Sequence, residues 1–294
     1  MKHLVGKTKK ISGACVAFGS FDGIHAGHRS VIEKLIKTAT IKNLVPVLVS
    51  FDADDGKNLI LTTESEKVFL LQAFPIEYVI SIPVPLTDNL FIKEVLLELL
   101  SAKAIVIGKN HDALSLYKSA GNKYGFDVVE CETVEDDEAP VCSARVSEAL
   151  DIHKMDNVTD LLNHPYIVSG RVMHGKQLGR TVGLPTANID IPRNKRLPPD
   201  GSYVTVTTVD GMRKVGLTNI GKRPTVDNLN HTTIETHILD YFGDLYGTEL
   251  VIEFHRFIRE VSTFDNLKAL REQIERDILS LGDYIEEIKN SYSK

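Results

Sequence analysis

Short apolar runs alternate with amphipathic stretches through the first half of the sequence. The first run, residues 14–18, has the length of a buried strand and is closed by Gly19. A stretch with apolar residues at helical spacing follows, from Val31 to Ala39. This alternation predicts a parallel sheet covered by helices on both faces. The predicted strands are residues 14–18, 45–51, 78–82, 104–108 and 126–131, and the later predicted helices are residues 64–73, 88–100, 114–123 and 143–153.

The second half is rich in strand patterns instead. Asp210-Gly211, between two of these patterns, is a strong hairpin signal. The pattern predicts an antiparallel sheet closed into a barrel, because closure removes exposed strand edges. The predicted strands are residues 167–173, 203–209, 212–217, 233–239 and 249–258.

A helix is predicted after the last of these strands. Thr263 or Asp265 is the expected N-cap. An apolar stripe along the helix predicts that it covers the barrel. The stripe consists of Leu267, Leu270, Ile274 and Ile278.

The length of 294 residues suits two domains, each with its own core. The change of pattern places them at residues 1–158 and 159–294, with residues 156–163 as the link. The lysine-rich stretch before Ala14 is expected to lie in solvent, and no segment approaches the ~20 apolar residues of a membrane span.

Composition narrows the class of protein further. The hydrophobic fraction of 43% and charged fraction of 25% are typical of a soluble globular protein. Neither half carries a basic excess and the net charge is −6, which disfavours nucleic acid as a partner. Cys15, Cys131 and Cys142 lack metal-ligand spacing and suit a reducing compartment. We therefore expect a cytoplasmic protein; the oligomeric state stays open.

Two histidines follow the first predicted strand, in the sequence GSFDGIHAGH of residues 19–28. His25 and His28 stand at the start of a predicted helix, where unpaired N–H groups attract anions. Both are candidates to donate hydrogen bonds to a phosphate as charge develops during group transfer. The alternative is that they cap and line an ordinary turn. Gly19 and Phe21, in the same stretch, are candidate ligand-binding residues.

A glycine-spaced basic loop stands just before a Pro-Thr-Ala-Asn tetrad within residues 170–191. Such glycines let the backbone approach a ligand, and their N–H groups form an anion-binding concavity. Thr186 and Asn188 offer neutral oxygens of the kind that Mg²⁺ accepts while it keeps most of its waters. The alternative is a surface loop followed by ordinary turn residues. The candidate phosphate-binding residues are Gly175, Lys176, Gly179 and Arg180.

Three further blocks follow this tetrad in a specific order: residues 216–225 (GLTNIGKRPT), 235–240 (ETHILD) and 245–247 (LYG). Together they resemble the riboflavin kinase domain of the two-domain bacterial riboflavin kinase/FAD synthetase family, over about residues 160–280. Residues 19–28 resemble the His-x-Gly-His signature of nucleotidyltransferases, and specifically the FMN adenylyltransferase module of the same family.

The resemblance implies a nucleotidyltransferase-like, Rossmann-like first domain and a six-stranded riboflavin kinase barrel. It implies phosphorylation of riboflavin to FMN, with ATP as co-substrate and Mg²⁺ held by Thr186 and Asn188. Glu235 is then the expected general base, which takes the proton of the ribityl hydroxyl. Arg259 matches a family position near the flavin pocket. The alternative for Glu235 is a solvated residue or a cross-strand partner in a half-exposed strand, and the alternative for Arg259 is a surface pair with Glu260.

Three departures from the family concern the first domain. Residues 51–56 (FDADDG) stand where the family has Pro-His-Pro, and their carboxylates repel a triphosphate. Residues 109–113 (KNHDA) replace an acidic-aromatic-basic loop around the flavin. Of a Ser-Ser-Thr element followed by a phosphate-binding arginine, Ser143 and Arg145 remain.

These departures leave three functional hypotheses. The first is a riboflavin kinase in which FAD formation from FMN is absent or much slower. The second keeps both reactions. The third is a non-catalytic, flavin-responsive binding or regulatory protein.

Overall fold

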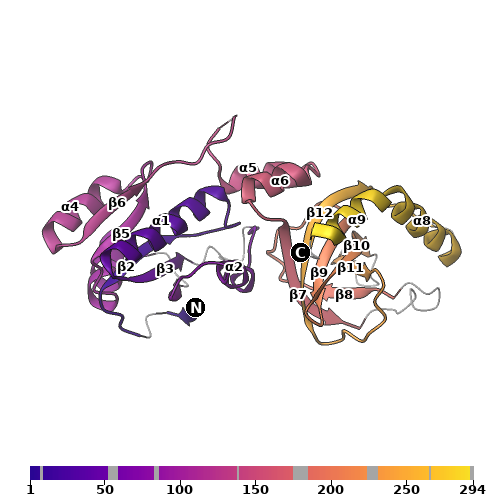
Figure 1. The fold of residues 1–294 in the computed structure, drawn as a ribbon, viewed down its shortest axis with the longest axis horizontal. Coiled ribbons are helices and arrows are strands. Elements are labelled where there is room, and N and C mark those ends of the chain that lie inside the picture. The colour runs from indigo at the N-terminus through magenta and orange to yellow at the C-terminus, as the bar shows by residue number, and fades with distance from the viewer. Residues whose placement is uncertain are drawn as a thin grey trace. The chain divides into compact units, whose positions relative to one another are not determined.

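The computed structural model of the protein describes residues 1–6, 9–51, 59–82, 86–137, 139–174, 185–223, 231–264 and 266–291 (Figure 1). The chain forms two compact units. The first consists of residues 1–146, 161–163 and 194–196, and the second of residues 147–160, 164–193 and 197–294. The domain boundary at residues 158/159 stays a prediction.

A six-stranded sheet forms the centre of the first unit, with strand order β1-β4-β3-β2-β5-β6 and every pair parallel. The prediction of a parallel sheet is confirmed. Central strands of such a sheet are buried on both faces, which is why they are nearly continuous apolar runs in the sequence. The strands are β1 (Lys2–Val5), β2 (Ala14–Gly19), β3 (Val45–Phe51), β4 (Tyr78–Ile82), β5 (Ala104–Gly108) and β6 (Asp127–Cys131).

Helices cover both faces of this sheet, as predicted. Ile32 and Leu35 of one helix join the core on one face, and Phe91 and Tyr117 of two others join the core on the opposite face. The segment predicted as one helix at residues 88–100 is instead a short α-turn followed by a π-helix. The helices of this unit are α1 (Ala26–Lys42), α2 (Glu64–Leu71), α3 (Asp88–Leu90), η1 (Phe91–Leu99) and α4 (Leu114–Tyr124). Helix α5 (Ser143–Asp151) begins in the first unit, and most of α5 and of α6 (Met155–Leu162) belongs to the second unit.

The strand order identifies the edge of the sheet where a ligand is expected. The chain runs from β2 to β3 and β4 on one side, and β5 and β6 lie on the other side of β2. Ligands of open parallel sheets bind at such a reversal, outside the carboxyl ends of the strands. The loop after β2, which carries His25, begins at this point.

The second unit contains a closed six-stranded antiparallel barrel, with strand order β10-β11-β8-β7-β12-β9. The predicted barrel is confirmed. Asp210 and Gly211 both have positive φ, 52° and 75°, as the tightest hairpin turns require. The strands are β7 (Tyr166–Met173), β8 (Ala187–Asp190), β9 (Gly201–Val209), β10 (Met212–Arg223), β11 (His231–Ile238) and β12 (Glu249–Arg259).

Two helices pack on the outside of the barrel: α8 (Leu267–Ser280), as predicted, and α9 (Gly282–Ser291), which was not predicted. Their apolar residues share a core with strands β9 and β10. The predicted cap at Thr263 or Asp265 is wrong, because Asn266 Oδ1 accepts the Ala269 N–H at 2.9 Å and caps α8. The residues of this shared core include Val204, Val206, Val215, Leu217, Ile274, Ile278, Ile285 and Ile288.

Residues 156–163, the predicted link, lie mostly in α6, which buries Met155, Val158 and Leu162 at helical spacing. That this segment joins the two halves stays a prediction. The described residues of the lysine-rich N-terminal stretch are mostly exposed, as expected, and include the edge strand β1, which pairs with β4. No helix in the described part of the chain is long and apolar enough to cross a membrane.

Candidate active sites

The loop between β2 and α1 has an unusual backbone. Phe21, Gly23 and Ile24 have φ values of 49°, 87° and 46°. Positive φ at a β-branched residue such as Ile24 is a genuine outlier. Such strain persists only where the surrounding structure holds it, and it gathers at functional sites.

Hydrogen bonds from residues 61 and 62 hold this loop. The Asp22 carboxylate accepts the N–H groups of Leu61 at 3.0 Å and Thr62 at 2.8 Å. The Gly23 N–H donates to Thr62 Oγ1 at 2.9 Å. The Ser143 hydroxyl donates to the Asp22 carbonyl at 2.8 Å. The loop is therefore fixed from two distant parts of the sequence.

His25 and His28 lie together at the start of α1. The two rings are stacked with centroids 3.6 Å apart, and His25 Nδ1 accepts the His28 N–H at 3.4 Å. Burial lowers the pKa of His25 to about 4, against the opposing effect of Asp22. Burial, with His25 and Lys67, also holds the pKa of His28 well below its usual value. Both rings are therefore neutral at pH 7.

The buried Nδ1 atom of His28 has no hydrogen-bond partner among the described residues. A buried polar atom without a partner is costly, and such an atom at a helix N-terminus suits a ligand that supplies the missing bond. A bound anion stabilises the protonated ring as well. A bound phosphate can therefore supply a hydrogen bond to this buried pair and favour its protonation, whereas two solvated turn histidines already have water as a partner.

Stability should depend on pH through His25. The pKa of this ring is about 4 in the folded chain, against 6.5 for a solvated histidine, so below pH 6.5 the unfolded chain binds a proton that the folded chain does not. The free energy of unfolding of the first unit should fall by about 3 kcal/mol between pH 6.5 and 4. Hydrogen exchange of buried β2 amides measures this. His25→Asn, which keeps a capping side chain, should flatten the dependence by about one proton, and an unchanged slope would contradict the assignment.

The other candidates of the first unit have structural partners. Arg145 forms a two-pronged ion pair with Asp136, at 3.0 and 2.7 Å. Phe21 is 2% exposed and belongs to the core, where the centroid of its ring lies 5.2 Å from that of His28. Gly19 ends β2. The acidic residues Asp52, Asp54 and Asp55 lie outside the described residues.

In the second unit, strand register brings polar residues into one row. Glu235 lies directly opposite Asn219 of β10 on one side and Asn188 of β8 on the other. Ser202 lies opposite Asn219, and Arg259 opposite Ser202. Directly opposite residues of an antiparallel pair point to the same face. The five side chains therefore share one face of the barrel wall.

Four residues of this row, Ser202, Asn219, Glu235 and Arg259, line a pocket between the barrel wall and α8. The pocket encloses about 770 Å³, open solvent at its mouth included. Glu235 and His237 line it together, as predicted from their alternation along the strand. Arg259 donates to Asp277 of α8 at 3.0 Å, so its partner is not the adjacent Glu260 carboxylate. The apolar lining includes Leu217, Ile258, Val261, Phe264, Leu270 and Ile274.

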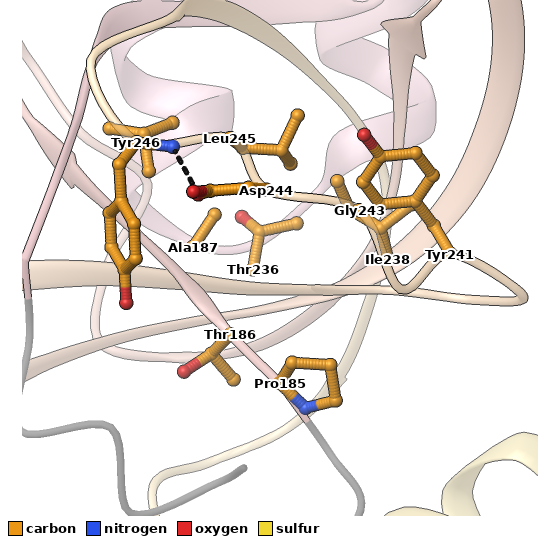
Figure 2. A pocket seen from close by; sticks show the side chains of 11 residues that line it. Pro185, Thr186, Ala187, Thr236, Ile238, Tyr241, Gly243, Asp244, Leu245 and Tyr246 are labelled. Atoms are coloured by element: carbon orange, nitrogen blue, oxygen red, sulfur yellow. Dashed lines mark hydrogen bonds between the residues drawn. The ribbon is translucent and has the colours of Figure 1, made fainter.

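A second hollow opens at one end of the barrel and encloses about 400 Å³, open solvent included. Figure 2 shows Tyr246 and Tyr241 on opposite sides of it, with Ala187 and Thr236 between them. The Asp244 carboxylate accepts the Tyr246 N–H at 3.0 Å and orders the rim.

Thr186 lines both hollows. The segment before it is anchored, because the His237 ring donates from Nδ1 to the Pro185 carbonyl at 2.9 Å. A carbonyl oxygen only accepts, so Nδ1 carries the proton and the tautomer of His237 is fixed. Sequence alone could pair His237 with Glu235 on one strand face but not with Pro185. The predicted phosphate-binding residues Gly175, Lys176, Gly179 and Arg180 lie outside the described residues.

The donor set suits a hard cation that retains water. Thr186 carries a hydroxyl oxygen and Asn188 an amide oxygen, and Glu235 is the cross-strand neighbour of Asn188. Among the described residues there is no group of three or more His, Cys, Asp and Glu side chains that could hold a metal. A Mg²⁺ ion that uses few protein oxygens together with substrate phosphates fits these residues.

The histidine pair at the sheet reversal and the carboxylate-bearing pocket beside the barrel define a two-domain transferase. The riboflavin kinase family model matches residues 162–285, and the FAD synthetase model matches residues 7–145. The chain belongs to the bifunctional riboflavin kinase/FMN adenylyltransferase family.

Relatives of that name cover nearly the whole chain. The protein from Escherichia coli strain K12 is 32% identical over 92% of this chain and 93% of its own. The one from Buchnera aphidicola subsp. Schizaphis graminum is 30% identical over 94% and 96%. A solved structure of a Streptococcus pneumoniae protein called macrolide-efflux protein has a TM-score of 0.81 and 25% identity over 94% of this chain and 97% of its own.

Proposed function

We propose that the chain phosphorylates riboflavin to FMN with ATP, in the barrel of the second unit, and that its first unit is an adenylyltransferase that acts on FMN. The observation that carries the first part is the pocket that places Glu235 beside apolar and polar walls, on a strand next to Asn188. A non-catalytic flavin-responsive protein is not favoured, because both family models match an enzyme.

Riboflavin suits the pocket between the barrel and α8. Its flat ring requires apolar walls, which Leu217, Ile258 and Leu270 supply. The ribityl chain requires polar partners, and Asn219 and Glu235 line the same pocket. Glu235 is proposed to accept the proton of the terminal hydroxyl as that oxygen attacks the γ-phosphoryl group.

ATP suits the hollow at the end of the barrel. Thr186 lines this hollow as well as the flavin pocket. The γ-phosphoryl group of an ATP bound in the hollow, if it lies near Thr186, is therefore within reach of riboflavin in the other pocket. Thr186 and Asn188 are proposed to hold Mg²⁺, which when bound neutralises charge on the transferring group. Gly175, Lys176, Gly179 and Arg180 are proposed to hold phosphates. Arg259, fixed by Asp277, is proposed to orient the flavin.

The experiment that tests the proposal follows the flavins directly. Purified protein is mixed with riboflavin, ATP and Mg²⁺, and riboflavin, FMN and FAD are separated over a long time course. FMN should accumulate first. An unchanged riboflavin pool would refute the proposed function.

The first unit is proposed to form FAD more slowly than the second forms FMN. His25 and His28 retain the means to stabilise charge on a transferred nucleotide. Asp52, Asp54 and Asp55 bring carboxylates where the family has Pro and His, which weakens triphosphate binding unless extra cation is recruited. FAD formation from FMN should therefore be much slower than FMN formation, with a steeper Mg²⁺ dependence.

The measurement is FAD produced from FMN across a Mg²⁺ series, with His28→Ala as the variant that removes the histidine pair. Any FAD formation should be lost in this variant while FMN formation continues. FAD made as fast as FMN at modest Mg²⁺, and abolished in the variant, would contradict the expected slowness and establish full bifunctionality.

A further inference from the structure

Three residues from far along the chain complete the first unit. Residues 194–196 belong to that unit, although in the sequence they stand between β8 and β9. Ile60 and Lys195 form a parallel bridge. The Ile60 N–H donates to the Asn194 carbonyl, and the Arg196 N–H donates to the Ile60 carbonyl, both at 2.8 Å. The backbone beside Ile60 is therefore held by this segment.

The Lys195 side chain lies fully inside the unit. Its ammonium is 2.8 Å from Glu66 Oε2, and both side chains have 0% exposure. The ammonium also donates to the Leu61 carbonyl. Glu66 Oε2 in turn accepts the Thr63 N–H at 2.8 Å, in the capping box of α2. Burial lowers the pKa of Lys195, and the Glu66 carboxylate opposes this effect.

A buried ion pair is a poor source of net stability, because desolvation offsets much of the attraction. In some proteins a buried polar pair instead fixes the placement of the groups around it. Here the group placed is Leu61, whose carbonyl binds Lys195 and whose N–H binds Asp22. Thr62, the next residue, binds both Asp22 and Gly23.

We infer that Lys195 is a positioning residue for the β2–α1 loop that carries His25 and His28. It fixes residues 61 and 62, and these hold Asp22 and Gly23 in the strained loop conformation. The inference that this positioning serves catalysis by His25 and His28 rests on the proposed adenylyl transfer. The inference that Lys195 orders the loop does not. A domain cut from the chain before residue 194 lacks this support.

Two variants of the full chain separate positioning from charge neutralisation. Lys195→Met leaves Glu66 buried without its cation, and should lower the unfolding temperature of the first unit by roughly 10 °C. Lys195→Met with Glu66→Gln removes both charges but keeps an acceptor for the Thr63 N–H, and should recover most of that temperature. Lys34→Met, at an exposed position of α1, is the matched control.

Hydrogen exchange at Leu61, Thr62 and Gly23 is the deciding readout. In both Lys195 variants these amides should exchange at least about tenfold faster than in the wild type, because the side chain at position 195 no longer donates to the Leu61 carbonyl. FMN formation should continue at the wild-type rate. Wild-type exchange in the double variant would overturn the inference, since Lys195 would then act only as a counter-charge. A wild-type chain that makes no FAD would refute adenylyl transfer, while the exchange rates would still decide the role of Lys195.

Discussion

Replacing Glu235 with glutamine is expected to lower kcat for FMN formation by about 10²–10⁴-fold and to change riboflavin binding far less. Glutamine keeps the shape of the side chain and its place in the pocket beside His237. It cannot take a proton from the ribityl hydroxyl, which is a weak nucleophile at neutral pH. Steady-state kinetics with riboflavin and ATP varied in turn measure both quantities.

A matched control is Glu249→Gln, which removes a carboxylate at an exposed barrel position at the start of β12. It should leave kcat unchanged. If Glu235→Gln altered only KM, Glu235 would be a binding residue and the proposed base would lie elsewhere.

Replacing Asn188 with alanine should reduce FMN formation at least about 100-fold and raise the Mg²⁺ concentration that the reaction requires. Asn188 lies beside Glu235 across the β8–β11 pair, so the two side chains point to the same face of the barrel wall. The measurement is the initial rate across a Mg²⁺ series, with the unfolding temperature as a check that the fold is intact.

Asn188→Asp provides the chemical control, because it keeps an oxygen at the same position. It should retain a lower Mg²⁺ requirement than Asn188→Ala. Unchanged turnover in the alanine variant would refute the metal-site assignment.

Most of the architecture could be predicted because its signals are local. Buried parallel strands are apolar runs, and half-buried barrel strands alternate, so both sheets follow from short windows of sequence. Elements without a clear window were missed: β1 has the sequence KHLV and exists because it pairs with β4 at the sheet edge. Helix α6 spans eight residues, and packing of its apolar face stabilises such a short helix more than local propensity does.

The candidate sites could be predicted only in part, for a related reason. His25 and His28 stand on one short stretch, and their stacking follows from the helix start. The contacts between distant residues depend on the fold: Arg259 with Asp277, His237 with Pro185, and Lys195 with Glu66. No spacing rule predicts such pairs, because only the folded chain brings them together.

The most direct test of the central claim is the fate of the γ-phosphate. The protein is incubated with riboflavin, Mg²⁺ and ATP labelled at that phosphate, and the label in FMN is compared with the ADP formed. The account predicts one labelled phosphate in FMN for each ADP, with the transfer slowed in Glu235→Gln. Labelled inorganic phosphate without labelled FMN, or no consumption of ATP, would contradict it.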